Sequence, residues 1–181
     1  MSSGHIRVYT GDGKGKTTSA LGEALNTLCA NKCVCVFQFM KPALRRGEEL
    51  LINWFPHDLV FLPVGKPGFI HSHKVSDPSV PRHTLDMIKA ERALRFAREV
   101  MHGEQYHLMI LDEINMAIYF QMIPLKEVLS LIDDKPPGMN LVLTGQKAHP
   151  EVMKRAHQVI EIRNVRHYYN QGVQARMGIE Y

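Results

Sequence analysis

The sequence is poor in residues that crosslink a chain or anchor it in a membrane. Only three of its 181 residues are cysteines, and Cys29, Cys33 and Cys35 form neither a Cys-X-X-Cys pair nor a zinc-ligand spacing. Buried thiols in a reducing compartment are the simpler interpretation. No apolar run approaches the roughly 18 residues that a membrane span needs, and the first ten residues lack the pattern of a secretory signal. We therefore expect a soluble, cytoplasmic protein with no membrane partner.

A large excess of one charge is also missing. The chain has 22 basic and 18 acidic residues, and the net charge of +4 is too small to indicate binding to nucleic acid. A mildly basic protein does suit a small anionic substrate. The hydrophobic fraction of 45% is ordinary for a globular protein, and the length allows a single domain, residues 1–181, with a sizeable core.

Short apolar segments alternate with longer segments of helical periodicity. The predicted strands are His5–Tyr9, Cys33–Phe39, Leu59–Val64, Tyr106–Asp112, Asn140–Thr144 and Val159–Ile162. The predicted helices are Thr17–Asn31, Pro81–His102, Pro124–Ile132 and His149–His157. Loops are expected over residues 41–49 and 65–81, and the tail from residue 163 has no clear period. The alternation indicates an α/β fold with a parallel sheet and helices on both faces, in which ligands bind beyond the carboxyl ends of the strands.

The segment between the first predicted strand and the first helix is rich in glycine. It consists of Gly11, Asp12, Gly13, Lys14, Gly15, Lys16, Thr17 and Thr18. Glycines let backbone N–H groups surround phosphate oxygens, the lysine reaches the phosphates, and the threonine hydroxyl ligates Mg²⁺. The segment therefore predicts an ATP-binding loop and a P-loop NTPase (RecA-like) fold. The common form of this loop has glycine where Thr10 stands, so the loop is one residue shorter here. The flanking strand and helix disfavour the alternative, a chance Gly-Lys-Thr turn.

An acid pair, Asp112 and Glu113, follows the apolar run Leu108–Leu111. Carboxylates at the end of a buried strand are typical of groups that hold a divalent cation or its water in phosphate-loop proteins. The alternative is a helix N-cap followed by a first-turn acid. Because the phosphate loop and the acid pair both lie at carboxyl ends of predicted strands, we favour the metal role. The predicted metal ligands are Thr17, Glu113 and Asp112, with Mg²⁺ or Mn²⁺ as the ion.

Several segments together resemble one family, the ATP:corrinoid adenosyltransferases of the bacterial cobalamin pathway, CobA type. The resemblance extends nearly from end to end, and the shortened loop and the final Gly-Ile-Glu-Tyr are its most specific features. The segments that carry it are TGDGKGKTTSALGEAL at Thr10–Leu25, QFMK at Gln38–Lys41 with Gly47-Glu48 beyond it, LDE at Leu111–Glu113, LTG at Leu143–Gly145 and GVQARMGIEY at Gly172–Tyr181.

The resemblance implies a reaction. A Co(I) corrinoid attacks the 5′ carbon of ATP, and adenosylcobalamin (or adenosylcobinamide or an adenosylated cobyrate) and inorganic triphosphate are formed. It implies that ATP lies reversed relative to ordinary phosphate-loop enzymes. Lys16 and Glu113 are implied as catalytic residues, and Lys14, Lys16 and Mg²⁺ are expected to neutralise charge on the leaving triphosphate. A homodimer and an electron-donating flavoprotein partner are also implied.

The family carries a Gly-Phe-Thr-Trp-like segment whose aromatic side chains contact the lower face of the corrin. Here that segment is Gly68-Phe69-Ile70-His71, in which Phe69 matches and the tryptophan is replaced. The resemblance thus implies Phe69 and His71 as corrinoid-binding residues. An imidazole that coordinated cobalt would oppose its reduction, so we hypothesise that His71 packs against the corrin or points away.

Two further positions depart from the family pattern, because Asn26 and Gln146 stand where relatives often have arginine. Lys147 and Arg166 are candidate replacements for the lost guanidinium groups. A phosphate-loop kinase or NTPase acting on another small molecule is the main alternative function, and it predicts ADP as a product. Because of the departures, a binding protein without catalysis is the third hypothesis.

Overall fold

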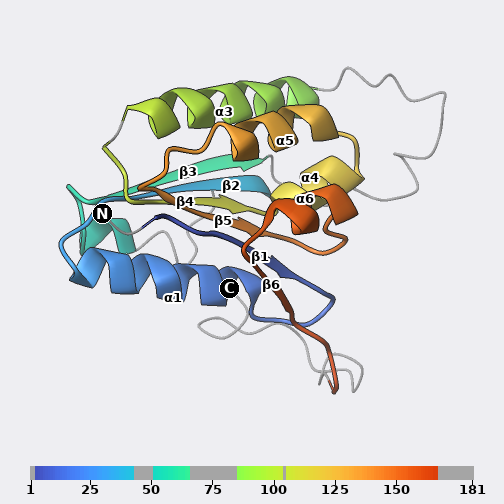
Figure 1. The fold of residues 1–181 in the computed structure, drawn as a ribbon, viewed down its shortest axis with the longest axis horizontal. Coiled ribbons are helices and arrows are strands. Elements are labelled where there is room, and N and C mark those ends of the chain that lie inside the picture. The colour runs from blue at the N-terminus through green and yellow to red at the C-terminus, as the bar shows by residue number, and fades with distance from the viewer. Residues whose placement is uncertain (1–2, 43–50, 66–84, 104, 167–181) are drawn as a thin grey trace.

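The computed structural model describes residues 3–42, 51–65, 85–103 and 105–166, which form a sheet between two layers of helices (Figure 1). The strands are β1 (Ile6–Thr10), β2 (Val34–Pro42), β3 (Leu59–Gly65), β4 (Leu108–Asp112), β5 (Asn140–Thr144) and β6 (Gln158–Glu161). Every pairing among them is parallel, and the strand order is β3-β2-β4-β5-β1-β6. The predicted α/β fold of P-loop NTPase (RecA-like) type is therefore confirmed.

Helices cover both faces of this sheet, as predicted. Helix α1 (Lys16–Cys29) lies on one face (Figure 1). The other face carries α3 (Leu85–His102), α4 (Ile114–Tyr119), α5 (Leu125–Asp133) and α6 (Pro150–Arg155).

The alternation of side chains along the strands divides the core into two parts. Val34 and Val36 of β2 belong to the cluster under α1, whereas Cys35 and Phe37 belong to the cluster on the opposite face. Strand β4 is buried at every position, because both of its faces are covered. Two buried faces explain why the strands read as continuous apolar runs in the sequence.

The ends of several elements differ from the predictions. Helix α1 stops at Cys29 rather than Asn31, and Asn31 has a positive φ of 56° that a helix does not allow. Strand β2 extends beyond Phe39 to Pro42, with a register shift against β3 after Gln38. Strand β4 begins at Leu108, two residues later than predicted.

Helix α6 is shorter than the predicted His149–His157 and spans Pro150–Arg155. The His149 imidazole Nδ1 accepts the Glu151 backbone N–H at 3.2 Å and so caps its start. The predicted helix over residues 81–102 is present from Leu85, and its first four residues lie outside the described part of the chain.

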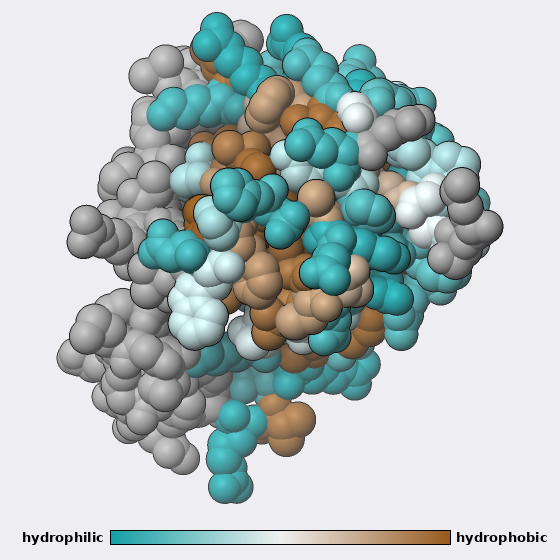
Figure 2. Space-filling model, turned by 90° about the vertical axis from the view of Figure 1, so that its left-hand side faces the viewer, coloured by the Kyte–Doolittle hydropathy of each residue, from teal (hydrophilic) through white to brown (hydrophobic). Residues whose placement is uncertain are grey.

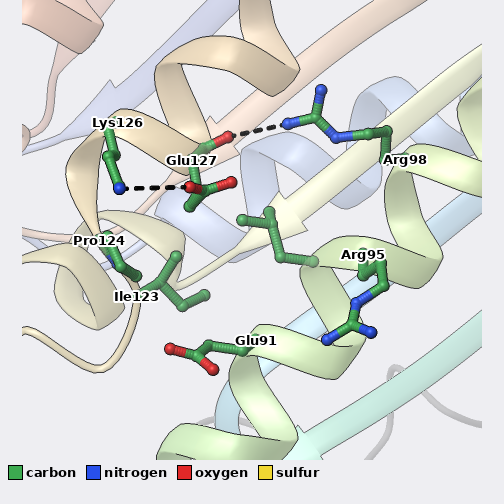
Figure 3. Close-up of a pocket in the computed structure, with 8 residues that line it drawn as sticks. Glu91, Arg95, Arg98, Ile123, Pro124, Lys126 and Glu127 are labelled. Atoms are coloured by element: carbon green, nitrogen blue, oxygen red, sulfur yellow. Dashed lines mark hydrogen bonds and ion pairs between the residues drawn. The ribbon is translucent and has the colours of Figure 1, made fainter.

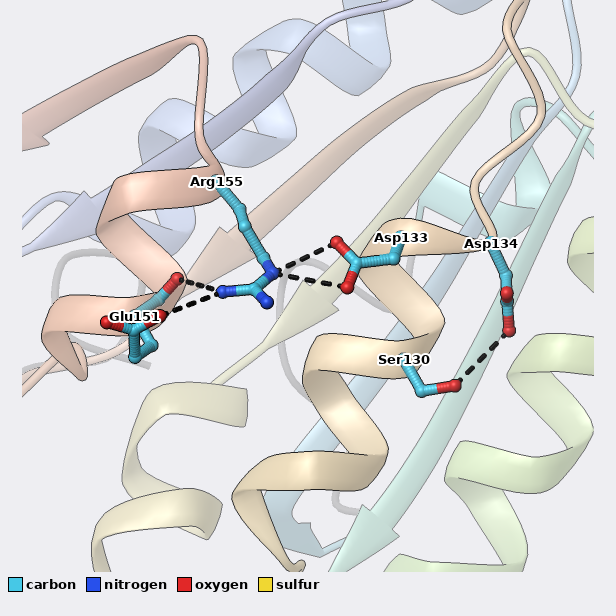
Figure 4. Close-up of polar contacts among 5 residues, drawn as sticks. All are labelled: Ser130, Asp133, Asp134, Glu151 and Arg155. Atoms are coloured by element: carbon cyan, nitrogen blue, oxygen red, sulfur yellow. Dashed lines mark hydrogen bonds and ion pairs between the residues drawn. The ribbon is translucent and has the colours of Figure 1, made fainter.

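Arg155 links α6 to the end of α5 on the surface (Figure 4). Its Nε donates to both carboxylate oxygens of Asp133, at 2.9 and 3.3 Å, and its Nη1 donates to a Glu151 carboxylate oxygen at 3.1 Å. Exposed ion pairs of this kind are screened by water and contribute little, so Arg155 orients two helices more than it stabilises the fold.

The side of the molecule at the amino ends of the strands faces the viewer in Figure 2. Hydrophobic side chains gather near the middle of this side, with hydrophilic ones mainly above and to the right of them. Within the described ranges, no helix is both long enough and apolar enough for a membrane span. The phosphate loop and the acid pair lie at the opposite, carboxyl end of the sheet.

Candidate functional site

The glycine-rich loop connects the end of β1 directly to the start of α1. Strand β1 ends at Thr10, and Gly11 has a φ of +95°. Gly15, with a φ of +117°, is the N-cap of α1, and its carbonyl accepts the Ser19 backbone N–H at 2.8 Å. Side chains rarely adopt such angles, so both turns require glycine. The start of α1, with its outward-pointing N–H groups, therefore opens onto the loop, as an anion site requires.

Edge strand β6 and the residues after it hold this loop in place. The Ile162 backbone N–H donates to the Thr10 carbonyl at 2.8 Å, and the Gly13 N–H donates to the Ile162 carbonyl at 2.8 Å. A Cβ atom on Gly11 would lie 2.3 Å from the same Ile162 carbonyl oxygen. Beyond it, the Asn164 N–H donates to the Asp12 carboxylate at 3.1 Å. Glycine at position 11 thus allows the close approach of two backbones.

The two lysines of the loop differ in environment. Lys16 is buried, and its Nζ donates to the Gly13 carbonyl at 2.6 Å, so the ammonium lies folded over the loop. Lys14 and Thr18 are exposed. Lys16 is therefore positioned to contact an anion held by the loop, and Lys14 can approach the same anion from solvent.

Asp112 is the centre of a buried polar cluster at the end of β4. Its Oδ1 accepts the Thr17 hydroxyl at 2.9 Å and the Thr144 hydroxyl at 2.6 Å. Its Oδ2 accepts the Gln38 side-chain amide at 2.9 Å. Only 1% of Asp112 is exposed, so these bonds replace the water that an ionised carboxylate needs. The contact with Thr17 confirms that the loop and the acid pair share one edge of the sheet.

Strand register explains this convergence. Gln38 on β2 lies beside Asp112 on β4. On the other side of β4, Leu111 pairs with Leu143 of β5, which brings Thr144 next to Asp112. In a parallel sheet the carboxyl ends meet along one edge, so the last residues of neighbouring strands become neighbours in space.

Glu113 follows in a strained backbone conformation. Its φ and ψ of 60° and 17° are left-handed, and it is the N-cap of α4 without a capping bond from its own side chain. Its backbone N–H donates to the Thr144 hydroxyl oxygen at 3.0 Å. A non-glycine residue in this region costs on the order of 1–3 kcal/mol and persists where the surroundings fix it, as they often do at functional sites. The carboxylate is half-buried and near Gly145, whose Cβ, if present, would lie 3.3 Å from Glu113 Oε2.

The donor set fits Mg²⁺. The Thr17 hydroxyl and the carboxylates of Asp112 and Glu113 are hard oxygen groups at one edge of the sheet. No cluster of three or more His, Cys, Asp or Glu side chains gathers anywhere in the described ranges. A few oxygen ligands supplemented by phosphate and water is the arrangement that Mg²⁺ prefers, rather than a cage of protein ligands.

Gln38 and Thr144 were not predicted as site residues. Both lie in segments that carry the family resemblance, and both are fully buried polar residues in otherwise apolar strands. A buried amide or hydroxyl requires a hydrogen-bond partner, and this was the available signal. This signal does not tell which strand supplies the hydrogen-bond partner.

A cavity of about 770 Å³ opens beside the phosphate loop, at the carboxyl ends of β1, β5 and β6. Gly11, Asp12, Gln146 and Lys147 are among its lining residues. Gln146 and Lys147 therefore adjoin the loop. Asn26 does not, because it lies ten residues after Lys16 on α1 and hence about 15 Å along the helix.

A second cavity, of about 310 Å³, lies between α3 and α5 (Figure 3). Arg98 donates to the Glu127 carbonyl at 3.3 Å on its wall, and Lys126 lies 4.0 Å from the Glu127 carboxylate. Arg98 also pairs with Asp134. These two cations are thus partnered by the protein itself.

The predicted corrinoid-binding residues, Phe69 and His71, lie outside the described residues. So do Gly47-Glu48 and Gly172–Tyr181 of the resemblance. The site described above is consequently the phosphate and metal half of the predicted active site.

Comparison with known proteins agrees with the resemblance. The family described as ATP:corrinoid adenosyltransferase BtuR/CobO/CobP matches residues 2–181. A corrinoid adenosyltransferase of Escherichia coli (strain K12) is 30% identical over 178 residues, which cover 98% of this chain and 86% of that protein. One from Pseudomonas aeruginosa is 32% identical, with 98% and 84% covered. The corrinoid adenosyltransferase CobA of Salmonella typhimurium is 31% identical, with 98% and 86% covered.

Among solved structures, the flagellar accessory protein FlaH from Methanocaldococcus jannaschii is similar in fold. The TM-score is 0.56 at 14% sequence identity, with 89% of this chain and 72% of that chain covered. At this identity the likeness extends to the fold alone.

Proposed function

The chain belongs to the ATP:corrinoid adenosyltransferase family, and on that premise we propose that its loop binds the triphosphate of ATP while a corrinoid approaches the ribose. Its reaction is the transfer of the adenosyl group of ATP to a corrinoid. In the proposed step, the electron pair of Co(I) forms a bond to the 5′ carbon. The bond from that carbon to the triphosphate oxygen breaks, and triphosphate leaves with the electron pair.

The hydrogen bond between Thr17 and Asp112 is the observation that supports this assignment most. It joins the first turn of α1 to the end of β4 at 2.9 Å, so the loop threonine lies against the strand-end carboxylate, which supports a shared metal site. In donating to Asp112, the Thr17 hydroxyl is held in one orientation beside that carboxylate. Asp112 then acts through Thr17, and Glu113 supplies the more accessible carboxylate.

The protein's own contribution is positioning and electrostatics, because the nucleophile belongs to the corrinoid. Lys16 and Lys14 neutralise negative charge that grows on the triphosphate as it leaves. When bound through Thr17 and Glu113, Mg²⁺ supplies further neutralisation of that charge. The backbone N–H groups that follow Gly13 in the loop and at the start of α1 cradle the phosphates.

The decisive experiment combines ATP, Mg²⁺ and chemically reduced Co(I)balamin under anaerobic conditions. We expect a light-sensitive alkyl–cobalt product and one inorganic triphosphate per product. Omission of the reductant should prevent both. Release of ADP with no alkyl–cobalt product would instead identify a kinase or NTPase, and binding without any product would identify a non-catalytic protein.

The corrinoid side is assigned to Phe69 and His71 on the family pattern alone. We propose that Phe69 contacts the lower face of the corrin and that His71 does not coordinate cobalt. Electron paramagnetic resonance of the bound Co(II) corrinoid tests this, since an axial nitrogen ligand splits the cobalt signal. A nitrogen-split signal that disappears in His71→Ala would refute the proposal, whereas an unsplit signal in both proteins agrees with it.

Three further features are proposed from family membership. The protein acts as a homodimer in the cytoplasm and accepts electrons for Co(II) reduction from a flavoprotein. Sedimentation analysis of the purified chain tests the dimer, and a monomer at micromolar concentration would contradict it. Replacing the chemical reductant with a reduced flavoprotein tests the electron source.

A further inference from the structure

One hydroxyl group, that of Thr144, contacts both members of the acid pair. It donates to Asp112 Oδ1 at 2.6 Å and accepts the Glu113 backbone N–H at 3.0 Å. Thr144 ends β5, whereas the acids follow β4, so the contacts join the ends of two neighbouring strands. Thr144 is fully buried and has no direct route to a ligand in solvent.

The direction of these hydrogen bonds is determined by chemistry. A backbone N–H can only donate, so the Thr144 oxygen must accept from Glu113. Its single proton is then left for Asp112, whose ionised carboxylate can only accept. The distance of 2.6 Å is that of a close hydroxyl–carboxylate hydrogen bond. The arrangement thus favours one orientation of the hydroxyl, with its proton toward Asp112.

The same contact fixes the backbone of Glu113. Glu113 is in the left-handed region, which a glutamate does not adopt without support. A second bond between the same two turns assists, because the Asn115 side-chain amide donates to the Gly145 carbonyl at 3.2 Å. Without the Thr144 oxygen, the Glu113 N–H loses its acceptor, and the turn that aims the carboxylate is free to relax.

We propose that Thr144 is a positioning residue that sets both carboxylates of the metal site at once. It orients Asp112, which in turn holds the Thr17 hydroxyl, and it fixes the backbone from which the Glu113 side chain extends. The inference rests on the proposed metal site of Thr17, Asp112 and Glu113. In this proposal Thr144 itself contacts neither the metal nor the substrate.

The test uses Thr144→Val, which keeps the shape of the side chain and removes both hydrogen bonds, and Thr144→Ser, which keeps both. The affinity for ATP is measured by titration calorimetry without corrinoid, once with Mn²⁺ and once with a chelator. The ratio of the two affinities is the gain that the metal provides. Because no turnover occurs, this ratio is independent of catalysis.

In Thr144→Val we expect the metal-dependent gain to fall at least tenfold, in line with the 10–100-fold effects of residues that orient metal ligands. The affinity in chelator should stay within about twofold of the unsubstituted protein. Thr144→Ser should retain the metal-dependent gain in ATP affinity. The electron paramagnetic resonance spectrum of bound Mn²⁺ should change in Thr144→Val and not in Thr144→Ser.

Thr27→Val is the matched control, because the Thr27 hydroxyl donates to the Glu23 carbonyl at 2.8 Å within α1 and takes no part in the site. It should leave the metal-dependent gain unchanged. If Thr144→Val does not fold, Thr144→Cys replaces it, since a thiol is a weaker donor and acceptor of similar size.

Three outcomes would overturn the proposal. A metal-dependent gain in Thr144→Val within twofold of the original shows that the hydroxyl does not position the acids. An equal loss of ATP affinity with Mn²⁺ and in chelator shows a general structural role. If the unsubstituted protein itself gains no affinity from Mn²⁺, the proposed metal site is wrong, and the role of Thr144 falls with it.

Discussion

Lys16 is the residue to which we assign most of the charge neutralisation in the proposed reaction. Its buried ammonium lies against the Gly13 carbonyl, at the start of α1. We expect Lys16→Ala to lower turnover by at least 100-fold, because a positive charge is lost where negative charge develops. Formation of the alkyl–cobalt product under anaerobic conditions measures this. Lys32→Ala, which removes an exposed lysine beyond the other end of α1, is the control and should retain full activity. Full activity in Lys16→Ala would contradict the assignment.

Tyr9 gives a prediction about pH. Burial raises the pKa of Tyr9 to about 12, and its hydrogen bond to Glu23 at 2.5 Å acts in the same direction. The unfolded phenol ionises near pH 10, so the unfolded chain loses its proton first as the pH rises. Stability that is complete below pH 10 should therefore decline between about pH 10 and 12.

Tyr9→Phe removes the ionising group and retains the ring. Urea unfolding at pH 9 and at pH 11.5 should show a larger loss of stability in the original protein than in Tyr9→Phe. Other groups that titrate in this range affect both proteins alike. Equal losses in the two proteins would show that Tyr9 does not contribute.

At the scale of elements, two glycines can be compared: Gly145 in the turn after β5 and Gly22 inside helix α1. Gly145 has a φ of +125°, and an added Cβ would lie 3.1 Å from Asn115 Cβ and 3.2 Å from the Met116 backbone nitrogen. Gly22 lies inside α1, and an added Cβ there meets no atom within 4 Å.

Gly145→Ala is expected to destabilise the protein by about 1–3 kcal/mol and to weaken metal-dependent ATP binding, because it strains the turn beside Glu113. Gly22→Ala is expected to stabilise it by about 0.5–1 kcal/mol, because alanine favours the helix. Urea unfolding measures both. A change in the free energy of unfolding of the opposite sign, for either substitution, would mean that the backbone at that position differs from the one described.

The strands and the phosphate loop were predictable from the sequence because each depends on local information. An apolar run buried on both faces is a strand signal, and the glycine-lysine pattern specifies a turn before a helix. Helix α4 was missed for the converse reason. Its six residues, INMAIY, are too short and too uniformly apolar to show a helical period, and its start depends on the left-handed turn at Glu113.

The contacts of Gln38 and Thr144 were beyond prediction for a different reason. Their positions in the chain are distant from Asp112, and only the strand order β2-β4-β5 makes them its neighbours. Sequence patterns identify strands more readily than they identify which strand lies beside which. The acid pair could therefore be recognised, while the groups that orient it could not.

For the molecule as a whole, two of the three cysteines report on folding. Burial raises the pKa of the Cys35 thiol to about 12, and Cys35 is fully buried in β2. Cys29 is exposed at the end of α1, so the expectation of buried thiols is wrong for this residue. A thiol reacts as the thiolate, so both its burial and its raised pKa protect Cys35 from thiol reagents in the folded protein.

We expect a thiol reagent at pH 8 to modify Cys29 rapidly and Cys35 only as fast as the whole sheet opens. Peptide mass spectrometry after timed labelling distinguishes the sites, and urea should accelerate labelling of Cys35 in step with global unfolding. Cys29→Ser should leave the slow phase unaltered. Rapid labelling of Cys35 without denaturant would show that β2 opens independently of the rest.

The attachment of the phosphate loop to β6 has one more consequence. Strand β6 is at the edge of the sheet and largely exposed, yet Ile162 just beyond it both donates to and accepts from the loop. An edge is where deuterium from the solvent enters a sheet most readily. A nucleotide that fills the loop should therefore slow deuterium uptake at the amides of Gly13 and Ile162. Occupancy of the site could then be followed from the border of the sheet, without a label on the nucleotide.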